Sequence, residues 1–168
     1  MKFIDTCGVL LFINRRDMLR PHYNLGNKPA ESCVAKNEKQ FCIPMPALGE
    51  AVYKVHEKCG DNADEVLEEL NRLIRTNFLR VRFINNPSKT FQIAKQLSSE
   101  MKDDRDSISP MDALILATAI TEQDCYALYT TDTKLILDTR VQDVISDSRD
   151  ELGFQPMHVY DIDDILRS

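Results

Sequence analysis

Four acidic residues stand where apolar, strand-like segments end or where buried helices begin. They are Asp5, Glu50, Asp112 and Asp132. Because an open parallel sheet gathers the carboxyl ends of its strands at one edge, these side chains are expected to converge there. Converging carboxylates repel one another and raise each other's pKa unless a cation compensates. Since Mg²⁺ and Mn²⁺ prefer oxygen ligands, the four residues predict a divalent-metal site that acts on a phosphate group.

Each of these acids also has a structural explanation. Asp5 and Asp132 stand where an N-cap would begin a helix, and Ser109 with Asp112 fits a capping box. Glu50 has the weakest structural reason, because a glutamate in the first turn of a helix gains only a few tenths of a kcal/mol from the helix dipole. Taken singly, the acids are explained by capping. Taken together, four carboxylates carry a repulsion that helix caps alone do not justify.

The sequence gives little support to other chemistries. Its cysteines include no Cys-x-x-Cys pair and its histidines have no ligand spacing, which argues against a zinc site and favours free thiols. No Gly-rich phosphate loop and no Gly-x-Ser-x-Gly string is present. Nucleotide binding by such a loop and serine hydrolysis are therefore disfavoured.

Length and composition predict a single domain over residues 1–168. The chain is 43% hydrophobic, and a domain of this size buries roughly 70% of its unfolded surface. No apolar run reaches the ~20 residues that a membrane helix needs, and the N-terminus enters a strand pattern without a signal peptide. We therefore expect a cytoplasmic protein with no membrane partner.

Charge is unevenly distributed along the chain. The net charge of −6 by itself disfavours a nucleic-acid partner. Residues 71–95, however, contain no acid and several bases: Arg72, Arg75, Arg80, Arg82, Lys89 and Lys95. Residues 100–164 are strongly acidic. The basic stretch fits guidance of a polyanion or contact with an acidic partner, and it fits a solvated surface equally well.

Strand and helix signals alternate from one end of the chain to the other. They predict a three-layer α/β fold, a mostly parallel sheet of four or five strands with helices on both faces. Strands are expected at 2–4, 41–43, 79–83, 126–131 and 157–160. Helices are expected at 9–13, 47–58, 61–77, 88–102, 109–120, 134–138 and 141–148. A basic insertion at about 14–40 interrupts this order. In the third strand, alternation predicts that Phe83 faces inward and that Arg80 and Arg82 face outward.

Several of these segments resemble the four motifs of the PIN-domain nucleases. This family includes the toxin ribonucleases of bacterial and archaeal toxin–antitoxin pairs. The similar segments are Phe3-Ile4-Asp5-Thr6, the lone Glu50 in the helix after the second strand, residues 109–117 and residues 128–132. They occur in the order of the family's motifs and span nearly the whole chain. The segments around Asp112 and Asp132 are the most specific.

The resemblance implies a metal-dependent endoribonuclease that cuts single-stranded or structured RNA. Asp5 and Asp132 would bind Mg²⁺ or Mn²⁺ directly, and Asp112 would bind it directly or through water. Glu50 would be a further ligand or the base that orients the attacking water. Three hydroxyl groups would position the carboxylates: those of Thr6, Thr130 and Ser109.

The resemblance also implies partners. RNA would be the substrate, an antitoxin protein would be the partner of a toxin component, and a homodimer would be the assembly common in the family. Contacts with the RNA backbone phosphates are expected from four arginines: Arg15, Arg16, Arg80 and Arg82.

Two features depart from the family pattern. Lys134 stands two residues after Asp132, at a position that is often acidic in the family, and this change would weaken a second metal site. The connection at 14–40 is longer than in compact members, which would alter substrate access or partner docking. Two alternatives therefore stay open. One is a catalytically inactive PIN-fold module that binds RNA or a protein partner, and the other is a nuclease directed at DNA, although the chain lacks the extra acids and helical arch of flap-type nucleases.

Overall fold

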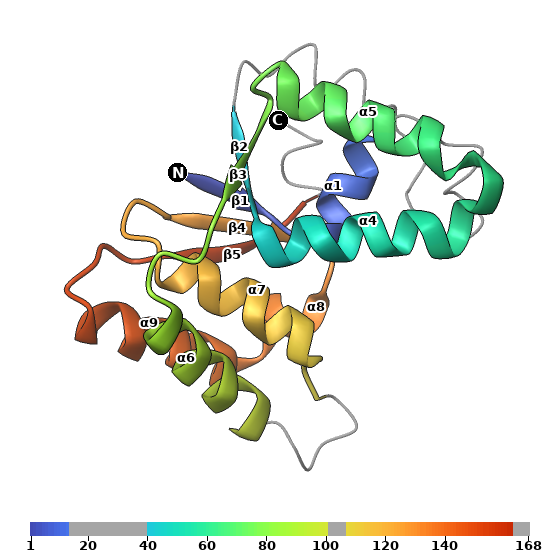
Figure 1. Cartoon of the computed structure of the whole chain (residues 1–168). Helices are drawn as coiled ribbons and strands as arrows, with labels where there is room; N and C mark the ends of the chain where they lie inside the picture. Colours follow the sequence, from blue (N-terminus) through green and yellow to red (C-terminus); the bar gives the residue numbers. More distant parts are fainter. Residues whose placement is uncertain (14–39, 101–106, 163–168) are drawn as a thin grey trace.

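Parallel strands form the central layer of the described part of the chain. The computed structural model describes residues 1–13, 40–100 and 107–162. Its strands are β1 (Lys2–Ile4), β2 (Phe41–Pro44), β3 (Leu79–Arg82), β4 (Ala127–Thr130) and β5 (His158–Asp161). They form one five-stranded sheet in the order β3-β2-β1-β4-β5, with every neighbouring pair parallel (Figure 1). The predicted parallel sheet is confirmed.

The strand order creates a switch point between β1 and β4. From β1 the chain adds β2 and β3 on one side of the sheet, and later it adds β4 and β5 on the other side. In open α/β sheets, ligands bind outside the carboxyl ends of the strands at such a point. Because β1 ends at Ile4 and β4 ends at Thr130, the predicted site residues Asp5 and Asp132 lie at this position.

Helices cover both faces of the sheet. Their bounds are α1 (Thr6–Phe12), α4 (Met45–Cys59), α5 (Ala63–Arg75), α6 (Pro87–Glu100), α7 (Pro110–Ile120), α8 (Thr133–Leu137) and α9 (Thr139–Glu151), with a 3-10 turn, η1 (Gly60–Asn62), between α4 and α5. Figure 1 shows α1, α4 and α5 on one side of the sheet and α6, α7 and α9 on the other. The three predicted layers are therefore present.

Burial on both faces explains why the three central strands, β1, β2 and β4, are mostly apolar. In β1, Phe3 belongs to the core beneath α6, α7 and α9, and Ile4 belongs to the core beneath α1, α4 and α5. Helix α7 contacts α4, α6, α9 and β2. A helix enclosed in this way needs no polar stripe, and Ala113 and residues 115–120 are buried.

The predicted strands and helices are present, with ends that shift by a few residues. The weak helix predicted at 141–148 is longer in the structure, Thr139–Glu151, because Asp138 caps it at an earlier position. The inward orientation predicted for Phe83 is wrong: this side chain is 67% exposed. The ladder between β2 and β3 ends at the Pro44–Arg82 pair, so strand alternation no longer constrains residue 83.

Two further expectations are not tested by the described residues. The basic insertion predicted at about 14–40 falls almost wholly on residues 14–39, which lie outside the described residues. The assignment of one domain to the whole chain stays a prediction.

Within the described ranges, no helix has the length and apolar character that crossing a membrane requires. The cysteines described, Cys7, Cys42, Cys59 and Cys125, are free thiols as predicted.

Gly8 allows helix α1 to lie against the end of the sheet. A Cβ atom at this position would lie 2.4 Å from the side chain of Ile4 and 2.6 Å from that of Ile162. Because these separations are far below van der Waals contact, only the bare backbone of glycine fits. The same backbone carries the N–H group that reaches the carboxylate of Asp5.

A buried arginine stabilises the connection between α7 and β4. Arg149 of α9 is 1% exposed, and burial lowers the pKa of its guanidinium. Its N–H groups donate hydrogen bonds of 2.8 to 3.2 Å to the backbone carbonyl oxygens of Ile120, Glu122, Gln123, Cys125 and Gln155. These bonds hold the turn that leads into β4, the strand that ends beside Asp132.

Candidate active site

Asp5 lies at the carboxyl end of β1 and caps α1, as predicted. Its Oδ1 accepts a hydrogen bond from the Gly8 N–H at 2.7 Å, and its Oδ2 accepts one from the Thr130 hydroxyl at 2.5 Å. The residue is 7% exposed. Burial raises the pKa of Asp5 to about 6 although both hydrogen bonds lower it, and the charge of Asp112 raises it further. A buried carboxylate of this kind would be stabilised by a nearby cation.

Asp132 is connected to Asp5 through Thr130. The hydroxyl of Thr130 donates to Asp5 and accepts a hydrogen bond from the Asp132 N–H at 2.9 Å. Asp132 also caps α8, since its Oδ1 accepts a hydrogen bond from the Lys134 N–H at 2.9 Å. One predicted hydroxyl therefore holds two of the predicted acids in a fixed relation.

Asp112 lies in the first turn of α7 beside Ser109, the N-cap. The Ser109 hydroxyl accepts a hydrogen bond from the Asp112 N–H at 3.1 Å and donates one to the Asp112 Oδ2 at 2.6 Å. The predicted cap is confirmed, and Asp112 bonds to the hydroxyl of the cap residue. Burial raises the pKa of Asp112, and the charges of Glu50 and Asp132 raise it further.

Glu50 lies in α4, and both of its carboxylate oxygens have partners. The hydroxyl of Thr6 donates a hydrogen bond to Oε2, and the ammonium group of Lys54 pairs with Oε1 at 2.8 Å. The contact of Thr6 with a predicted acid agrees with the positioning role expected for this hydroxyl. Lys54 was not among the predicted site residues, although a Glu–Lys spacing of four in a helix is a pairing signal that the sequence carries.

The structure thus brings the four predicted acids together from separate segments of the chain. The charge of Asp112 acts on Asp5, and the charges of Glu50 and Asp132 act on Asp112. As these side chains lie, no group of three histidine, cysteine, aspartate or glutamate residues within the described ranges has metal-binding geometry. The donor set nevertheless fits Mg²⁺ or Mn²⁺, because such ions take oxygen ligands and are often held by one or two carboxylates together with water. The metal ligands stay a prediction.

Solved structures with a similar fold match nearly the whole chain. One match is a chain of VapBC2 from Rickettsia felis, whose structure was solved bound to a DNA fragment from the VapBC2 promoter. The TM-score is 0.59 and the identity is 17%, over 95% of this chain and 97% of that chain. DNA-bound VapBC from Salmonella typhimurium matches with a TM-score of 0.54 and 16% identity, over 95% and 96%. VapC20 of Mycobacterium tuberculosis, a sarcin-ricin loop cleaving toxin, matches with a TM-score of 0.51 and 16% identity, over 92% and 97%.

The chain has the PIN fold. Its sequence matches no protein-family model and no curated protein. Likeness at this level of identity establishes the fold, which does not by itself specify an activity. The function of this PIN fold therefore has to be inferred from the site.

Two of the four arginines predicted to contact phosphate lie within the described part of the PIN fold. Arg80 and Arg82 lie on β3, an edge strand of the sheet. Arg80 is exposed, whereas Arg82 is partly buried and its Nε has no hydrogen-bond partner among the described residues. Arg15 and Arg16 lie outside the described residues. Contact of all four with RNA stays a prediction.

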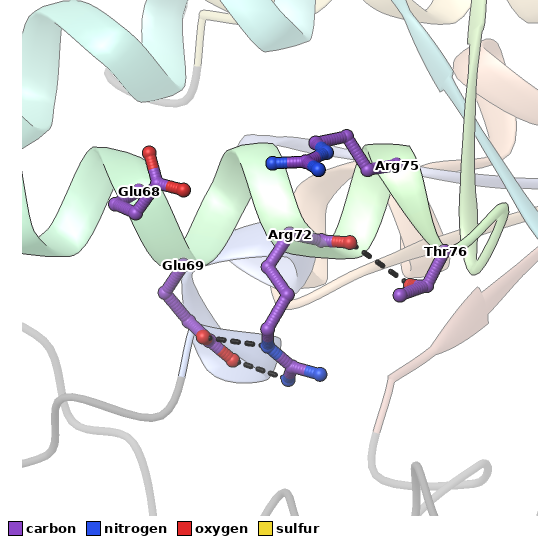
Figure 2. A pocket seen from close by; sticks show the side chains of 5 residues that line it. All are labelled: Glu68, Glu69, Arg72, Arg75 and Thr76. Atoms are coloured by element: carbon purple, nitrogen blue, oxygen red, sulfur yellow. Dashed lines mark hydrogen bonds and ion pairs between the residues drawn. The ribbon is translucent and has the colours of Figure 1, made fainter.

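The basic stretch at 71–95 forms no continuous face of the PIN fold. Its bases are divided among α5, β3 and α6, and α5 and α6 cover opposite faces of the sheet (Figure 1). A hollow of about 390 Å³ lies on α5. Figure 2 shows the side chains that line it, Glu68, Glu69, Arg72, Arg75 and Thr76. Glu69 holds Arg72 there through hydrogen bonds of 2.7 and 2.5 Å, and Lys89 on α6 pairs with Glu151. Part of the positive charge is therefore neutralised.

An apolar cleft opens beside Glu50 in the PIN fold. It has a volume of about 500 Å³ and is lined by Met45, Pro46, Gly49, Glu50, Phe83, Ile84, Met111 and Leu114. These residues come from α4, α7 and the segment after β3. The exposed ring of Phe83 therefore borders the candidate site. Sequence reasoning missed this cleft because its walls come from three segments that are far apart in the chain.

The raised pKa of Asp5 predicts a pH-dependent stability of the metal-free protein. Because the carboxyl binds its proton more tightly when folded (pKa about 6) than when unfolded (3.8), its stabilising contribution is full below pH 3.8 and is lost as the pH rises through 6. We expect the free energy of unfolding of the wild type, relative to that of Asp5→Asn, to fall by about 3 kcal/mol between about pH 4 and pH 7. Urea denaturation of both proteins in EDTA measures this difference, and a value independent of pH would contradict the prediction.

Proposed function

We propose that the chain is a divalent-metal-dependent endoribonuclease that hydrolyses RNA phosphodiester bonds, and that it acts as the toxin of a toxin–antitoxin pair. The observation that carries this proposal is the convergence of four carboxylates at the switch point of the sheet. One of them, Asp5, is buried with a pKa raised to about 6. Such an arrangement is costly unless a cation or a proton transfer makes use of it. The PIN fold shared with VapC20, a loop-cleaving toxin, supports the same reading.

In this proposal the three aspartates are the ligands of the metal ion. Asp5 and Asp132 hold Mg²⁺ or Mn²⁺ directly, and Asp112 holds it directly or through water. The bound ion supplies charge stabilisation for the phosphate group and makes water a better nucleophile. The Thr130 hydroxyl keeps Asp5 and Asp132 in their relative positions, and the Ser109 hydroxyl orients the carboxylate of Asp112.

Glu50 has a different role. Its carboxylate, oriented by the Thr6 hydroxyl, accepts a proton from the attacking water or joins the metal ligands once it leaves Lys54. The adjoining apolar cleft leaves room beside Glu50 for a nucleotide that flanks the scissile bond. This division of roles between Glu50 and the three aspartates is part of the proposal.

A PIN-fold module without catalytic activity is the second candidate. It is favoured by the ion pair between Lys54 and Glu50, which engages one of the four acids, and by Lys134 at the position two residues after Asp132. Such a module would bind RNA or a protein partner through the same fold. It would fold normally, bind no Mn²⁺ and cleave neither RNA nor DNA.

Labelled RNA and DNA of the same sequence, each incubated with Mg²⁺, Mn²⁺ or EDTA, test the proposed activity. We expect RNA to be cleaved with either metal ion and to stay intact in EDTA, with DNA cleaved at least about tenfold more slowly, a ratio that corresponds to 1.4 kcal/mol of barrier difference. Equal rates on both substrates would favour the DNA-directed nuclease. Failure to cleave either substrate, combined with the absence of Mn²⁺ binding, would favour the inactive module.

An antitoxin protein, the RNA substrate and a second copy of the chain complete the proposed set of partners. Two of the matching structures are VapBC complexes, which supports the proposal of an antitoxin here. Co-expression with the product of a neighbouring small gene, followed by light scattering, would show whether a complex forms and how many copies of the chain it contains.

A further inference from the structure

Lys54 lies where a positive charge meets the acidic site. Its Nζ is 2.8 Å from Oε1 of Glu50, and the two side chains are 27% and 16% exposed. The other carboxylate oxygen, Oε2, accepts the hydrogen bond from Thr6. Glu50 is therefore engaged at both carboxylate oxygens.

The charge of Lys54 reaches beyond its partner in the ion pair. It lowers the pKa of Asp5, of Asp112 and of the Cys7 thiol, in opposition to burial, which raises the pKa of all three. A surface pair at this helical spacing would contribute little. This pair borders the buried carboxylate of Asp5, where solvent screens charges less, so its electrostatic effect is larger.

A divalent ion and an ammonium group at the same carboxylates repel each other and compete for the same oxygen atoms. We propose that Lys54 is the internal competitor of the divalent ion: it neutralises the carboxylates in the metal-free protein and releases Glu50 when the ion binds. Lys54 thereby sets the metal affinity of the site. This inference rests on the proposed metal-dependent function and assigns the residue that regulates metal loading.

The substitution Lys54→Met tests the inference because it removes the charge and keeps a long side chain with high helix propensity. Lys58→Met is the matched control, since Lys58 lies one turn farther along α4 and pairs with Glu57. Mn²⁺ affinity of the full chain is measured by titration calorimetry at constant pH and salt, and circular dichroism checks the fold. We expect Lys54→Met to bind Mn²⁺ roughly tenfold more tightly than the wild type or better, the size of effect that one neighbouring charge produces.

The expected pattern has three further parts. Lys58→Met should bind Mn²⁺ within about twofold of the wild type, because exposed pairs have small effects. Lys54→Met should melt at a lower temperature than the wild type in EDTA, since its carboxylates lack their counter-charge, and should gain more from added Mn²⁺. Lys54→Arg, which keeps the charge, should bind the ion as the wild type does.

Two other outcomes of the Mn²⁺ titration would overturn the proposed role of Lys54, and one of them would also overturn the proposed metal-dependent function. If the wild type binds Mn²⁺ and Lys54→Met binds it no more tightly, the role of Lys54 is overturned while the metal-dependent function stands. If neither the wild type nor Lys54→Met binds Mn²⁺, both proposals are overturned. Lys54→Gln, titrated in parallel, gives the same comparison should Lys54→Met fail to fold.

Discussion

Asp132→Asn is expected to lower the rate of metal-dependent RNA cleavage by roughly a hundredfold or more, with little change in stability. Asparagine caps a helix about as well as aspartate does, so the hydrogen bond from the Lys134 N–H to residue 132 is retained. The substitution removes a negative charge at the end of β4, where Asp132 also acts on Asp112. Initial rates with labelled RNA in Mg²⁺ measure the effect, and circular dichroism verifies the fold.

Asp138→Asn provides the matched control for this prediction. Asp138 caps α9 by accepting a hydrogen bond from the Arg140 N–H at 2.9 Å, just as Asp132 caps α8. Its carboxylate pairs with the side chain of Arg140 at 2.8 Å and is not among the four acids of the site. We expect Asp138→Asn to cleave RNA as the wild type does. If Asp132→Asn also cleaved RNA at the wild-type rate, Asp132 would be only a helix cap.

Arg149→Met is expected to lower the free energy of unfolding by about 4 kcal/mol. The substitution leaves the carbonyl oxygens of the turn between α7 and β4 without their charged donor in a buried environment. A loss of this size lowers the melting temperature by roughly 10 °C in a domain of this length. Urea denaturation and thermal melting in EDTA measure the change.

Arg72→Met is the control for the arginine. Arg72 makes two hydrogen bonds with Glu69 on the exposed side of α5 (Figure 2), and exposed pairs contribute less than about 1 kcal/mol. Both substitutions replace arginine with methionine. The two positions differ in burial and in the acceptors that lose a hydrogen-bond donor. If Arg149→Met destabilises the protein no more than Arg72→Met does, the hydrogen bonds of Arg149 contribute little to stability.

The strands could be predicted because burial on both faces leaves a strong sequence pattern. Segments such as 41–43 and 127–130 are short apolar runs bounded by polar or turn-forming residues, which is typical of strands in a parallel sheet. The acids could be singled out for a related reason. Asp5 directly follows such a run, and the carboxyl ends of parallel strands gather at one edge.

Other features had no readable signal in local sequence. Arg149 looks like any charged residue of an amphipathic helix, yet it is buried because carbonyl oxygens from a distant turn surround its guanidinium. Phe83 continues the alternation of β3, yet it is exposed because its neighbour strand ends at Pro44. The partners of such a side chain belong to segments far away in the chain, and a single sequence does not indicate which segments these are.

The amino-acid sequence alone was enough to predict the alternation of strands and helices, the parallel sheet and the four acids at the segment ends, since these depend on periodicity and on the chemistry of single residues. The contacts that hold the acids were visible only in the folded chain. Thr130 lies between Asp5 and Asp132, Glu50 contacts Thr6 and Lys54, and an apolar cleft adjoins Glu50. Charge, burial and hydrogen-bond partners act over a few ångströms in space, and those distances arise only when segments that are far apart in the sequence pack together.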